Sequence, residues 1–414
     1  VNDLCPVGAL THRPWQYHYR PWELKKTETI DVMDAVGSNI RVDTRGPEVM
    51  RVIPRLNEDV NEEWLADKSR FSYDGLKRQR LDRPYVRKDG KLQPASWSEA
   101  FAAIAAKVKG VPGERIAALA GDLVDAESMV ALKDLVEGLG SKNLDCRQDG
   151  AAFDTSARAG YLFNTTIAGI EKADAILLIG TNPRWEAALV NARIRKRYLM
   201  GGLKVGVIGQ QLDMTYPTTY LGAGPQTLQD VVDGKHAFSE VLKEAKRPML
   251  ILGAGVLRRA DGPAIHALAR QLAESFNLIQ EDWNGFNVLH TAAARVGGLE
   301  LGFLPGQGGK ATADILSAAS AGQIDVVYLL GADEIDTSKL GKAFVIYQGH
   351  HGDRGAHRAD VILPGAAYTE KNGLYVNTEG RVQMARMAAF PLGEAREDWK
   401  IIRALGEQLG VKLP

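Results

Sequence analysis

The segment Ala175-Ile176-Leu177-Leu178-Ile179-Gly180-Thr181-Asn182-Pro183 decides the fold, because five consecutive apolar residues end at a glycine and a turn. An apolar run of this length indicates a strand buried on both faces, as in a parallel sheet. Six further runs have this character and precede a turn or a helical pattern: 115–120, 203–208, 248–252, 325–330, 343–347 and 360–363. The sequence therefore predicts an α/β fold of doubly wound parallel sheets.

Three of these runs end in a similar way, as Gly180-Thr181-Asn182-Pro183, Gly253-Ala254-Gly255 and Gly331-Ala332-Asp333-Glu334. Glycine at the carboxyl end of a parallel strand allows a backbone or a ligand to approach closely. Ligands of such folds bind at this edge of the sheet. We therefore expect binding chemistry, if the α/β region has any, at the carboxyl ends of the strands.

Two shorter regions precede the α/β pattern. Residues 1–30 are rich in aromatics, histidine and proline, which predicts an irregular packed segment without helix or strand. Residues 31–85 contain short alternating apolar stretches at 40–42 and 49–52, which predict small β-hairpins. The α/β region then covers 86–414 and begins with a helix at 97–108, for which Ser96 or Ser98 is the expected N-cap.

Composition limits the classes of function. A chain of 414 residues corresponds to about two to three domains. Its 51 Lys and Arg balance its 51 Asp and Glu, so no overall charge attracts nucleic acid or an anionic membrane. Two cysteines cannot form a disulfide framework, which favours a reducing compartment. Because the chain begins at Val1 and ends at Pro414 after a helical pattern, we expect it to be part of a longer protein.

Several motifs have both a functional and a structural interpretation. Gly253-Ala254-Gly255-Val256 is similar to the start of a dinucleotide fingerprint, but its third glycine and distal acidic residue are missing, so a tight turn is favoured. His350 and His351, near Asp353 and His357, could bind a metal, although neighbouring side chains of an extended segment point to opposite sides. A role in a turn or an interface is the favoured alternative.

The stretch 68–91 has nine basic and three acidic residues, so it either docks an acidic partner or forms local ion pairs on a solvated face. Cys146 follows a predicted helix end, and a buried inert thiol is its expected state. Cys5 precedes Pro6, and a cysteine followed by proline is a common last ligand of iron–sulfur motifs. One cysteine cannot hold a cluster, so its partner ligands must precede Val1.

Longer blocks of sequence carry a resemblance to a known family. They are Cys5-Pro6-Val7-Gly8-Ala9-Leu10-Thr11, Asp282-Trp283-Asn284, Val288-Leu289-His290, Val296-Gly297, 344–353, 359–371 and 375–381. They span nearly the whole chain, which resembles the large iron–sulfur subunit of respiratory complex I, NADH:quinone oxidoreductase. The motifs are most similar to those of mitochondrial and α-proteobacterial members.

This resemblance implies an electron-transfer and scaffold subunit of the peripheral arm, which passes electrons from NADH toward quinone. It assigns Cys5 as a [4Fe-4S] ligand and places further [4Fe-4S] and [2Fe-2S] clusters before Val1. Pro6, Trp15, Tyr17 and Trp22 would pack over the cluster and over partner subunits. The expected partners are other complex I subunits, without nucleic acid or direct membrane insertion. The expected location is the cytoplasmic face of a bacterial inner membrane or the matrix face of the mitochondrial one.

The resemblance also implies that the large region looks like a molybdopterin oxidoreductase without molybdopterin or molybdenum. The cysteines of the C-x2-C-x3-C-x27-C cluster motif of that family align with Asp31, Asp34, Ser38 and Ala66, none of which is a thiolate. We expect these four residues to converge in a vestigial 4Fe-4S-like subdomain. The molybdenum-ligand position falls near Ala151, and Cys146 is several residues too early.

Two other hypotheses remain open at this point. The first is a catalytic molybdopterin oxidoreductase of the formate dehydrogenase type, which requires a metal ligand at 146–151. The second is nucleotide binding at Gly253–Gly255, which would raise the melting temperature in the presence of ligand.

Overall fold

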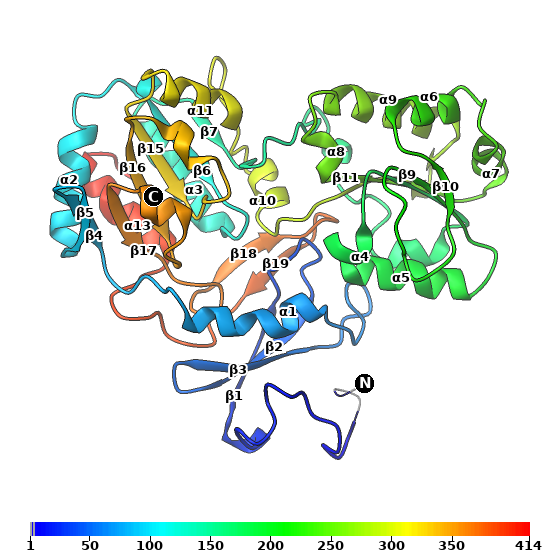
Figure 1. Cartoon of the computed structure of the whole chain (residues 1–414), viewed down its shortest axis with the longest axis horizontal. Coiled ribbons are helices and arrows are strands. Elements are labelled where there is room, and N and C mark those ends of the chain that lie inside the picture. The colour runs from blue at the N-terminus through cyan, green and yellow to red at the C-terminus, as the bar shows by residue number, and fades with distance from the viewer. Residues whose placement is uncertain (1, 3–4) are drawn as a thin grey trace.

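The computed structural model describes residue 2 and residues 5–414. Two α/β lobes lie side by side, and a small β region lies beneath them with the N-terminal segment at its far end (Figure 1). All seven predicted strands form, because each apolar run is buried on both faces between helices. The predicted helix at 97–108 is α2, and Ser96 caps it in a capping box with Glu99.

The first lobe contains a five-stranded parallel sheet in the order β10-β9-β8-β11-β14. Its strands are β8 (Ala175–Ile179), β9 (Lys204–Ile208), β10 (Thr219–Gly222), β11 (Pro248–Gly253) and β14 (Phe286–Leu289). Its helices are α4 (Pro183–Glu186), α5 (Ala188–Leu199), α6 (Pro225–Val232), α7 (Phe238–Glu244), α8 (Ala254–Leu257) and α9 (Gly262–Ser275). Helices α4 and α5 cover one face, and α6 and α9 cover the other (Figure 1).

The second lobe contains a seven-stranded sheet in the order β5-β4-β17-β16-β15-β6-β7. Its strands are β4 (Tyr85–Lys88), β5 (Lys91–Pro94), β6 (Ile116–Ala120), β7 (Asn143–Asp145), β15 (Val326–Leu330), β16 (Phe344–Gly349) and β17 (Val361–Pro364). Its helices are α2 (Trp97–Val108), α3 (Ala126–Gly138), α11 (Thr312–Ser320), α12 (Arg354–Arg358) and α13 (Asp398–Leu409). The β4–β5 hairpin is antiparallel to an otherwise parallel sheet.

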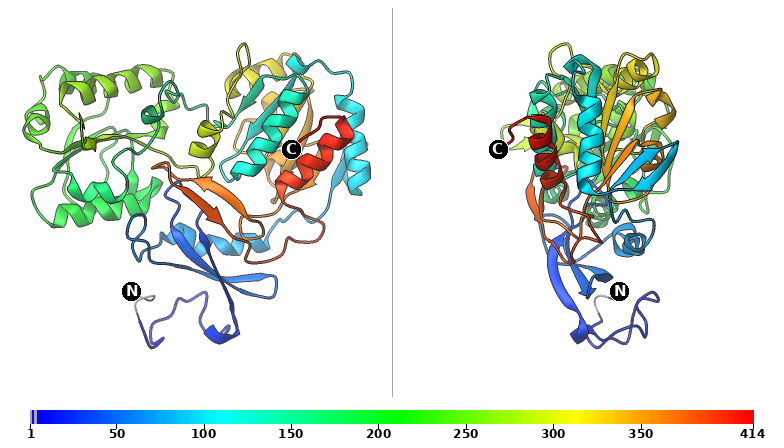
Figure 2. Two further views of the ribbon diagram at one scale, coloured as in Figure 1. Left: turned by 180° about the vertical axis from the view of Figure 1, so that it is seen from behind. Right: turned by 90° about the vertical axis from the view of Figure 1, so that its left-hand side faces the viewer.

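The two lobes are connected through short elements. Helix α10 (Arg295–Glu300) lies between them (Figure 1), and the first lobe also carries a small ladder of β12 (Ile279–Gln280) and β13 (Trp283–Asn284). Near the chain end, β18 (Gly373–Val376) and β19 (Val382–Ala385) form an antiparallel hairpin. This hairpin lies between the lobes and the N-terminal β region, as the view from behind shows (Figure 2).

The β region beneath the lobes is an antiparallel sheet of β1 (Lys25–Ile30), β2 (Asn39–Arg45) and β3 (Glu48–Pro54), followed by α1 (Asp67–Phe71). The predicted hairpin is therefore confirmed. The prediction that residues 1–30 contain no strand is wrong for Lys25–Ile30. These residues pair along their whole length with β2, so the expected boundary after residue 30 falls within one sheet.

The segment around β18 and β19 closes onto the loop after β1. The N–H of Thr378 donates to the carbonyl of Ala35 at 2.8 Å, and the Asn377 side chain donates to the carbonyl of Val36 at 3.0 Å. The Gln383 side chain donates to the carbonyl of Gly37 at 3.0 Å. Residues more than 300 positions apart in the chain thus enclose the loop that carries Asp31, Asp34 and Ser38.

Candidate functional site

Cys5 lies in a turn whose backbone surrounds its sulfur. The backbone N–H groups of Leu10 and Val7 lower the pKa of the Cys5 thiol, desolvation opposes them, and the N–H groups of Ala9 and Gly8 make smaller lowering contributions. Gly8 has a φ of +67°, which is the left-handed conformation that lets the chain fold back on the thiol. The side chain is half-buried and forms no disulfide. The turn is therefore built to stabilise a thiolate.

A thiolate with converging N–H donors is the form in which cysteine ligates an iron–sulfur cluster, so Cys5 fits the ligand role that the sequence assigns to it. The remaining cysteine, Cys146, is buried in the second lobe and belongs to a different core. Any further ligands of a cluster at Cys5 must therefore come from outside this chain.

Aromatic and basic residues surround the Cys5 turn. A cavity of about 1080 Å³ is lined by residues of the N-terminal segment, β3 and α1. Trp15 is buried and stacks under the guanidinium of Arg51 at 4.5 Å. Tyr17 and Trp22 are 96% and 78% exposed, so they do not pack over Cys5 within this chain. Their exposed rings are available to other chains.

The structure brings Asp31, Asp34 and Ser38 together in a buried loop. The N–H of Asp31 donates to the carbonyl of Ser38 at 2.8 Å. The hydroxyl of Ser69, in α1, donates to Oδ2 of Asp31 at 2.5 Å. Ala66 is the N-cap residue of that helix, three positions before Ser69. The predicted convergence is therefore confirmed for Asp31, Asp34 and Ser38, and Ala66 begins the helix whose Ser69 contacts Asp31.

Burial strongly perturbs the two carboxyl groups of this loop. Desolvation, followed by the charge of Asp34, raises the pKa of Asp31 to about 7. Desolvation also raises the pKa of Asp34, against a hydrogen bond from the N–H of Val36. Carboxyl, hydroxyl and methyl groups are poor or impossible replacements for thiolates, so these residues do not fit an iron–sulfur cluster.

Cys146 is a buried thiol in the core between β7 and α10. Desolvation raises its pKa to about 12, so the thiol is protonated at neutral pH. Its sulfur packs against Gly298 of α10, where an added Cβ would lie 2.7 Å from it. Ala151 is fully buried as well and offers no ligand atom. Neither Cys146 nor Ala151 therefore fits the role of a metal ligand.

A cationic side chain occupies the space beside Cys146. Arg295 is 3% exposed, and its Nη2 lies 3.0 Å from Oδ1 of Asp149. Its guanidinium lies 5.4 Å from the centre of the Phe153 ring, which stacks on His290 with 4.8 Å between centroids. The Nε2 atom of His290 is 2.5 Å from the carbonyl of Tyr161. This buried stack joins residues on both sides of the junction between the lobes.

The histidine cluster does not assemble a metal centre. The rings of His350 and His351 meet edge to face at 4.7 Å, so the prediction that they point to opposite sides is wrong. His351 Nε2 is 2.9 Å from the carbonyl of Gly75, and desolvation lowers the pKa of His350. Among residue 2 and residues 5–414, no three His, Cys, Asp or Glu side chains are arranged to hold a metal ion.

Gly253 has a packing role in the five-stranded sheet. A Cβ at this position would lie 2.5 Å from the carbonyl oxygen of Gly180, at the end of the neighbouring strand. The helix that follows, α8, has only four residues. A Cβ on Gly255 would meet no atom within 4 Å. These contacts favour the tight-turn interpretation over a dinucleotide site.

Many charges of the basic stretch 68–91 are satisfied within the chain. Arg80 pairs with Glu370 at 2.6 Å, Arg83 pairs with Asp82 at 2.9 Å, and Lys77 pairs with Glu48. The guanidinium of Arg87 donates to the carbonyls of Ala359 and His357. Local ion pairs and hydrogen bonds therefore explain most of this stretch, as the structural alternative predicted.

Two features were missed by the sequence analysis. Lys371 is buried and its Nζ bridges Asp125 at 2.6 Å and Asp398 at 2.7 Å. A second cavity, of about 490 Å³, lies nearby at the carboxyl ends of β6, β15 and β16. The sequence signal for the cavity was present in the glycine endings of the strands, whereas no local pattern marks Lys371.

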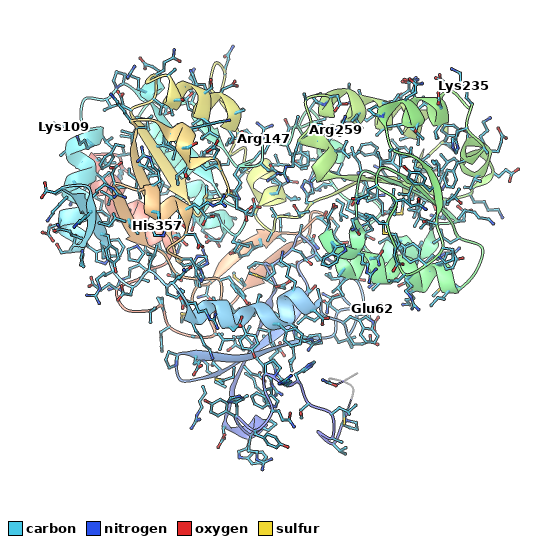
Figure 3. The ribbon with its side chains drawn as sticks, viewed as in Figure 1. Glu62, Lys109, Arg147, Lys235, Arg259 and His357 are labelled. Atoms are coloured by element: carbon cyan, nitrogen blue, oxygen red, sulfur yellow. The ribbon has the colours of Figure 1, made fainter. Side chains whose placement is uncertain are left out.

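Within the described part of the chain, no helix combines the length and the hydropathy that a membrane span requires. Figure 3 shows that charged side chains, such as Lys109, Lys235 and Arg259, project from the surfaces of both lobes.

Comparison with known families gives two matches. Residues 80–408 match the molybdopterin oxidoreductase model, and residues 24–74 match the model of the NADH-ubiquinone oxidoreductase NDSU1/NuoG-like 4Fe-4S domain. Residues 24–74 of this chain contain no cysteine, since its two cysteines are Cys5 and Cys146. This agrees with the cysteine-free alignment of Asp31, Asp34, Ser38 and Ala66.

Named relatives extend over the whole chain. The mitochondrial NADH dehydrogenase [ubiquinone] iron-sulfur protein 1 of Solanum tuberosum is 53% identical over 100% of this chain and 55% of its own length. An NADH-quinone oxidoreductase subunit of Rickettsia felis is 51% identical over 99% of this chain and 60% of its own length. The resemblance to the large iron–sulfur subunit of complex I is confirmed, and the chain spans little more than half the length of these relatives.

A solved structure supports the fold. Acetylene hydratase from Pelobacter acetylenicus superimposes with a TM-score of 0.68 at 14% identity, over 94% of this chain and 70% of that protein. At this identity the similarity concerns the architecture of the two lobes alone. The family match, which covers residues 80–408 and so more than half of the chain, shows that this chain belongs to the molybdopterin oxidoreductase family.

Proposed function

We propose that this chain is the larger part of an electron-transfer and scaffold subunit of the peripheral arm of complex I, on the path from NADH toward quinone. The observation that carries the proposal is the Cys5 turn, in which backbone N–H groups converge on a half-buried thiol. The names of relatives that are 51–53% identical support the assignment to the large iron–sulfur subunit.

In this proposal Cys5 supplies one thiolate to a [4Fe-4S] cluster whose other ligands lie in the remainder of the subunit. The bound cluster would supply one-electron transfer. The N–H groups of residues 7–10 stabilise the negative sulfur, and Trp15 with Arg51 limits access of water on one side. Further [4Fe-4S] and [2Fe-2S] clusters belong to the same part of the subunit in this proposal.

The two α/β lobes serve as a scaffold and docking surface. The donors at the expected molybdenum position do not fit a metal, because Cys146 is a protonated thiol in the core and Ala151 has no ligand atom. Arg295 and Phe153 fill the neighbouring space. The catalytic alternative of the formate dehydrogenase type therefore has no support from these side chains.

The region 31–85 is proposed to be a vestigial cluster subdomain. Its side chains now satisfy one another: Ser69 donates to Asp31, and the Nζ of Lys68 donates to the carbonyl of Met33 at 2.6 Å. The proposed partners are the other peripheral-arm subunits, which the exposed rings of Tyr17 and Trp22 would contact. The proposed location is the cytoplasmic or matrix face of the membrane that holds the complex.

Substitution of the two cysteines tests this proposal. Cys5→Ser, made in the full-length subunit within its complex, should remove or alter one [4Fe-4S] signal in electron paramagnetic resonance and slow electron transfer. A serine alkoxide is a harder and more basic ligand than a thiolate.

Cys146→Ser is the matched control and should leave every cluster signal intact. An unchanged set of signals in the Cys5→Ser complex would refute the assignment of Cys5. The loss of a signal in Cys146→Ser would revive a metal role for the second lobe.

A further inference from the structure

The second cavity lies at the switch point of the seven-stranded sheet. The chain runs from β6 outward to β7, and from β15 outward through β16 to β17, so the direction of winding reverses between the neighbours β6 and β15. The cavity of about 490 Å³ opens here, at the carboxyl ends of the strands. Open α/β sheets bind their ligands at such a point. We call this space the switch-point cavity.

One buried acceptor atom of a residue that lines the switch-point cavity has no matching donor. Gln148 lines it and is 6% exposed, and its Oε1 has no hydrogen-bond partner within residue 2 and residues 5–414. Asp122 also lines the cavity, but its carboxylate already has Nη2 of Arg295 at 3.7 Å and the side chain of Gln148 as partners. An unsatisfied buried acceptor is costly, so Oε1 of Gln148 favours a ligand that donates hydrogen bonds.

The acidic side chains around the cavity also favour a ligand that is positively charged. Asp333, Glu334 and Asp353 all line it. Desolvation, then the charges of Asp353 and Glu334, raises the pKa of Asp333 to about 6, and the opposing charge of His351 is a smaller effect, so the neighbouring carboxylates disfavour a further negative charge.

The cations nearby are largely committed elsewhere. Lys371 is held between Asp125 and Asp398, and Arg80 is paired with Glu370. Arg354 is the remaining strongly basic side chain in the lining. An anionic phosphate or pyrophosphate would therefore be repelled by the excess of carboxylates.

We propose that the switch-point cavity binds an organic ammonium or guanidinium ion. Its N–H groups would donate to Oε1 of Gln148, and its charge would be balanced by Asp333 and Asp353. The rings of Tyr347 and Tyr368, which also line the cavity, offer faces for the cation or its aliphatic chain. The ligand is either a free aliphatic polyamine or an arginine or lysine side chain of a neighbouring protein. This inference does not depend on the role of Cys5.

Calorimetric titration of the full-length protein tests the inference. One arm uses spermidine, and the other uses arginine capped at both its amino and carboxyl groups, so that the guanidinium is its only charge. We expect saturable binding in at least one arm, weakening as salt is added. Asp333→Asn and Gln148→Leu should each weaken binding by about tenfold or more, because each removes one interaction with the cation.

Asp314→Asn is the matched control, since Asp314 is exposed on α11 of the same lobe and the substitution removes the same charge. The Asp314→Asn variant should bind spermidine and capped arginine with the same affinity as the wild type. Stronger binding of spermidine indicates the free polyamine, and stronger binding of capped arginine indicates a partner's side chain. The inference is overturned if neither compound binds at millimolar concentration, or if Asp333→Asn binds equally well.

Discussion

The hydroxyl of Ser69 donates a hydrogen bond to Oδ2 of Asp31 over 2.5 Å, which joins the first turns of α1 to the loop after β1. Both residues are buried. The contact holds a carboxyl group in a position where a neighbouring carboxyl, Asp34, and the loss of water both oppose its ionisation. The stability of this region should therefore depend on pH.

Asp31 ordinarily titrates at 3.8, and burial raises its pKa to about 7. Between these values the folded protein binds a proton that the unfolded chain has lost, so the free energy of unfolding decreases as pH rises from about 4 to about 7. Asp31→Asn removes this titration and should raise Tm at pH 8, by about 2–4 °C for each kcal/mol gained. Scanning calorimetry at pH 5 and pH 8 measures the difference, with exposed Asp74→Asn as the control. An equal pH dependence in Asp31→Asn and the wild type would contradict this prediction.

Lys371→Met should be strongly destabilising. It leaves Asp125 and Asp398 buried without their shared cation, which costs about 3–5 kcal/mol in comparable buried pairs. Urea denaturation followed by circular dichroism gives the free energy of unfolding. Lys400→Met, which breaks the pair between the exposed Lys400 and the half-buried Glu397, should change the free energy of unfolding by less than about 1 kcal/mol. If the free energy of unfolding fell by a similar amount in the two variants, the buried interactions of Lys371 would contribute no more to stability than a surface ion pair.

The two cysteines should differ in reactivity by orders of magnitude. Burial raises the pKa of Cys146 to about 12, whereas backbone N–H groups lower that of Cys5. Because the thiolate is the reactive form, iodoacetamide at neutral pH should modify Cys5 in the cluster-free folded protein and spare Cys146. Peptide mass spectrometry after timed labelling measures both rates, and labelling in denaturant serves as the control. Rapid native modification of Cys146 would be inconsistent with its buried position.

Gly253→Ala and Gly255→Ala separate a packing role from a nucleotide-binding role. The first adds a Cβ that would lie 2.5 Å from the Gly180 carbonyl, and it should lower the free energy of unfolding by about 1–3 kcal/mol. The second meets no atom within 4 Å and should stay within about 0.5 kcal/mol of the wild type. Denaturation curves compare the two, and a nucleotide that raises Tm in the wild type but not in Gly255→Ala would restore the nucleotide-binding alternative.

The purified 414-residue chain alone should oxidise neither NADH nor formate. It has no complete dinucleotide fingerprint, and its single N-terminal cysteine cannot assemble a cluster. Assays with an artificial electron acceptor measure both activities, and the intact complex is the positive control for NADH. Turnover by the chain alone would overturn the assignment of its lobes as scaffold.

The seven buried strands, the helix that begins at Trp97 and the β2–β3 hairpin were predictable from sequence because their signals are local: apolar runs, capping residues and alternation. Cys5 was singled out as a candidate ligand because Pro6 follows it and because the resemblance assigns it that role, whereas the stabilisation of its thiolate by residues 7–10 is seen only in the structure. The alignment of Asp31, Asp34, Ser38 and Ala66 with the cluster motif came from the resemblance to molybdopterin oxidoreductases. Strand β1 was missed because its partner strand, and not its own composition, stabilises it.

Only the tertiary structure decided which distant residues meet. Lys371 joins Asp125 and Asp398 because the end of the chain packs against α3, and the loop of Asp31 is enclosed by residues 377–383. The switch-point cavity exists because β15 lies beside β6, an order that no local pattern specifies. Burial pattern and turn chemistry are encoded over a few residues, whereas strand order, cavity position and perturbed pKa values arise from packing between elements that are far apart in sequence.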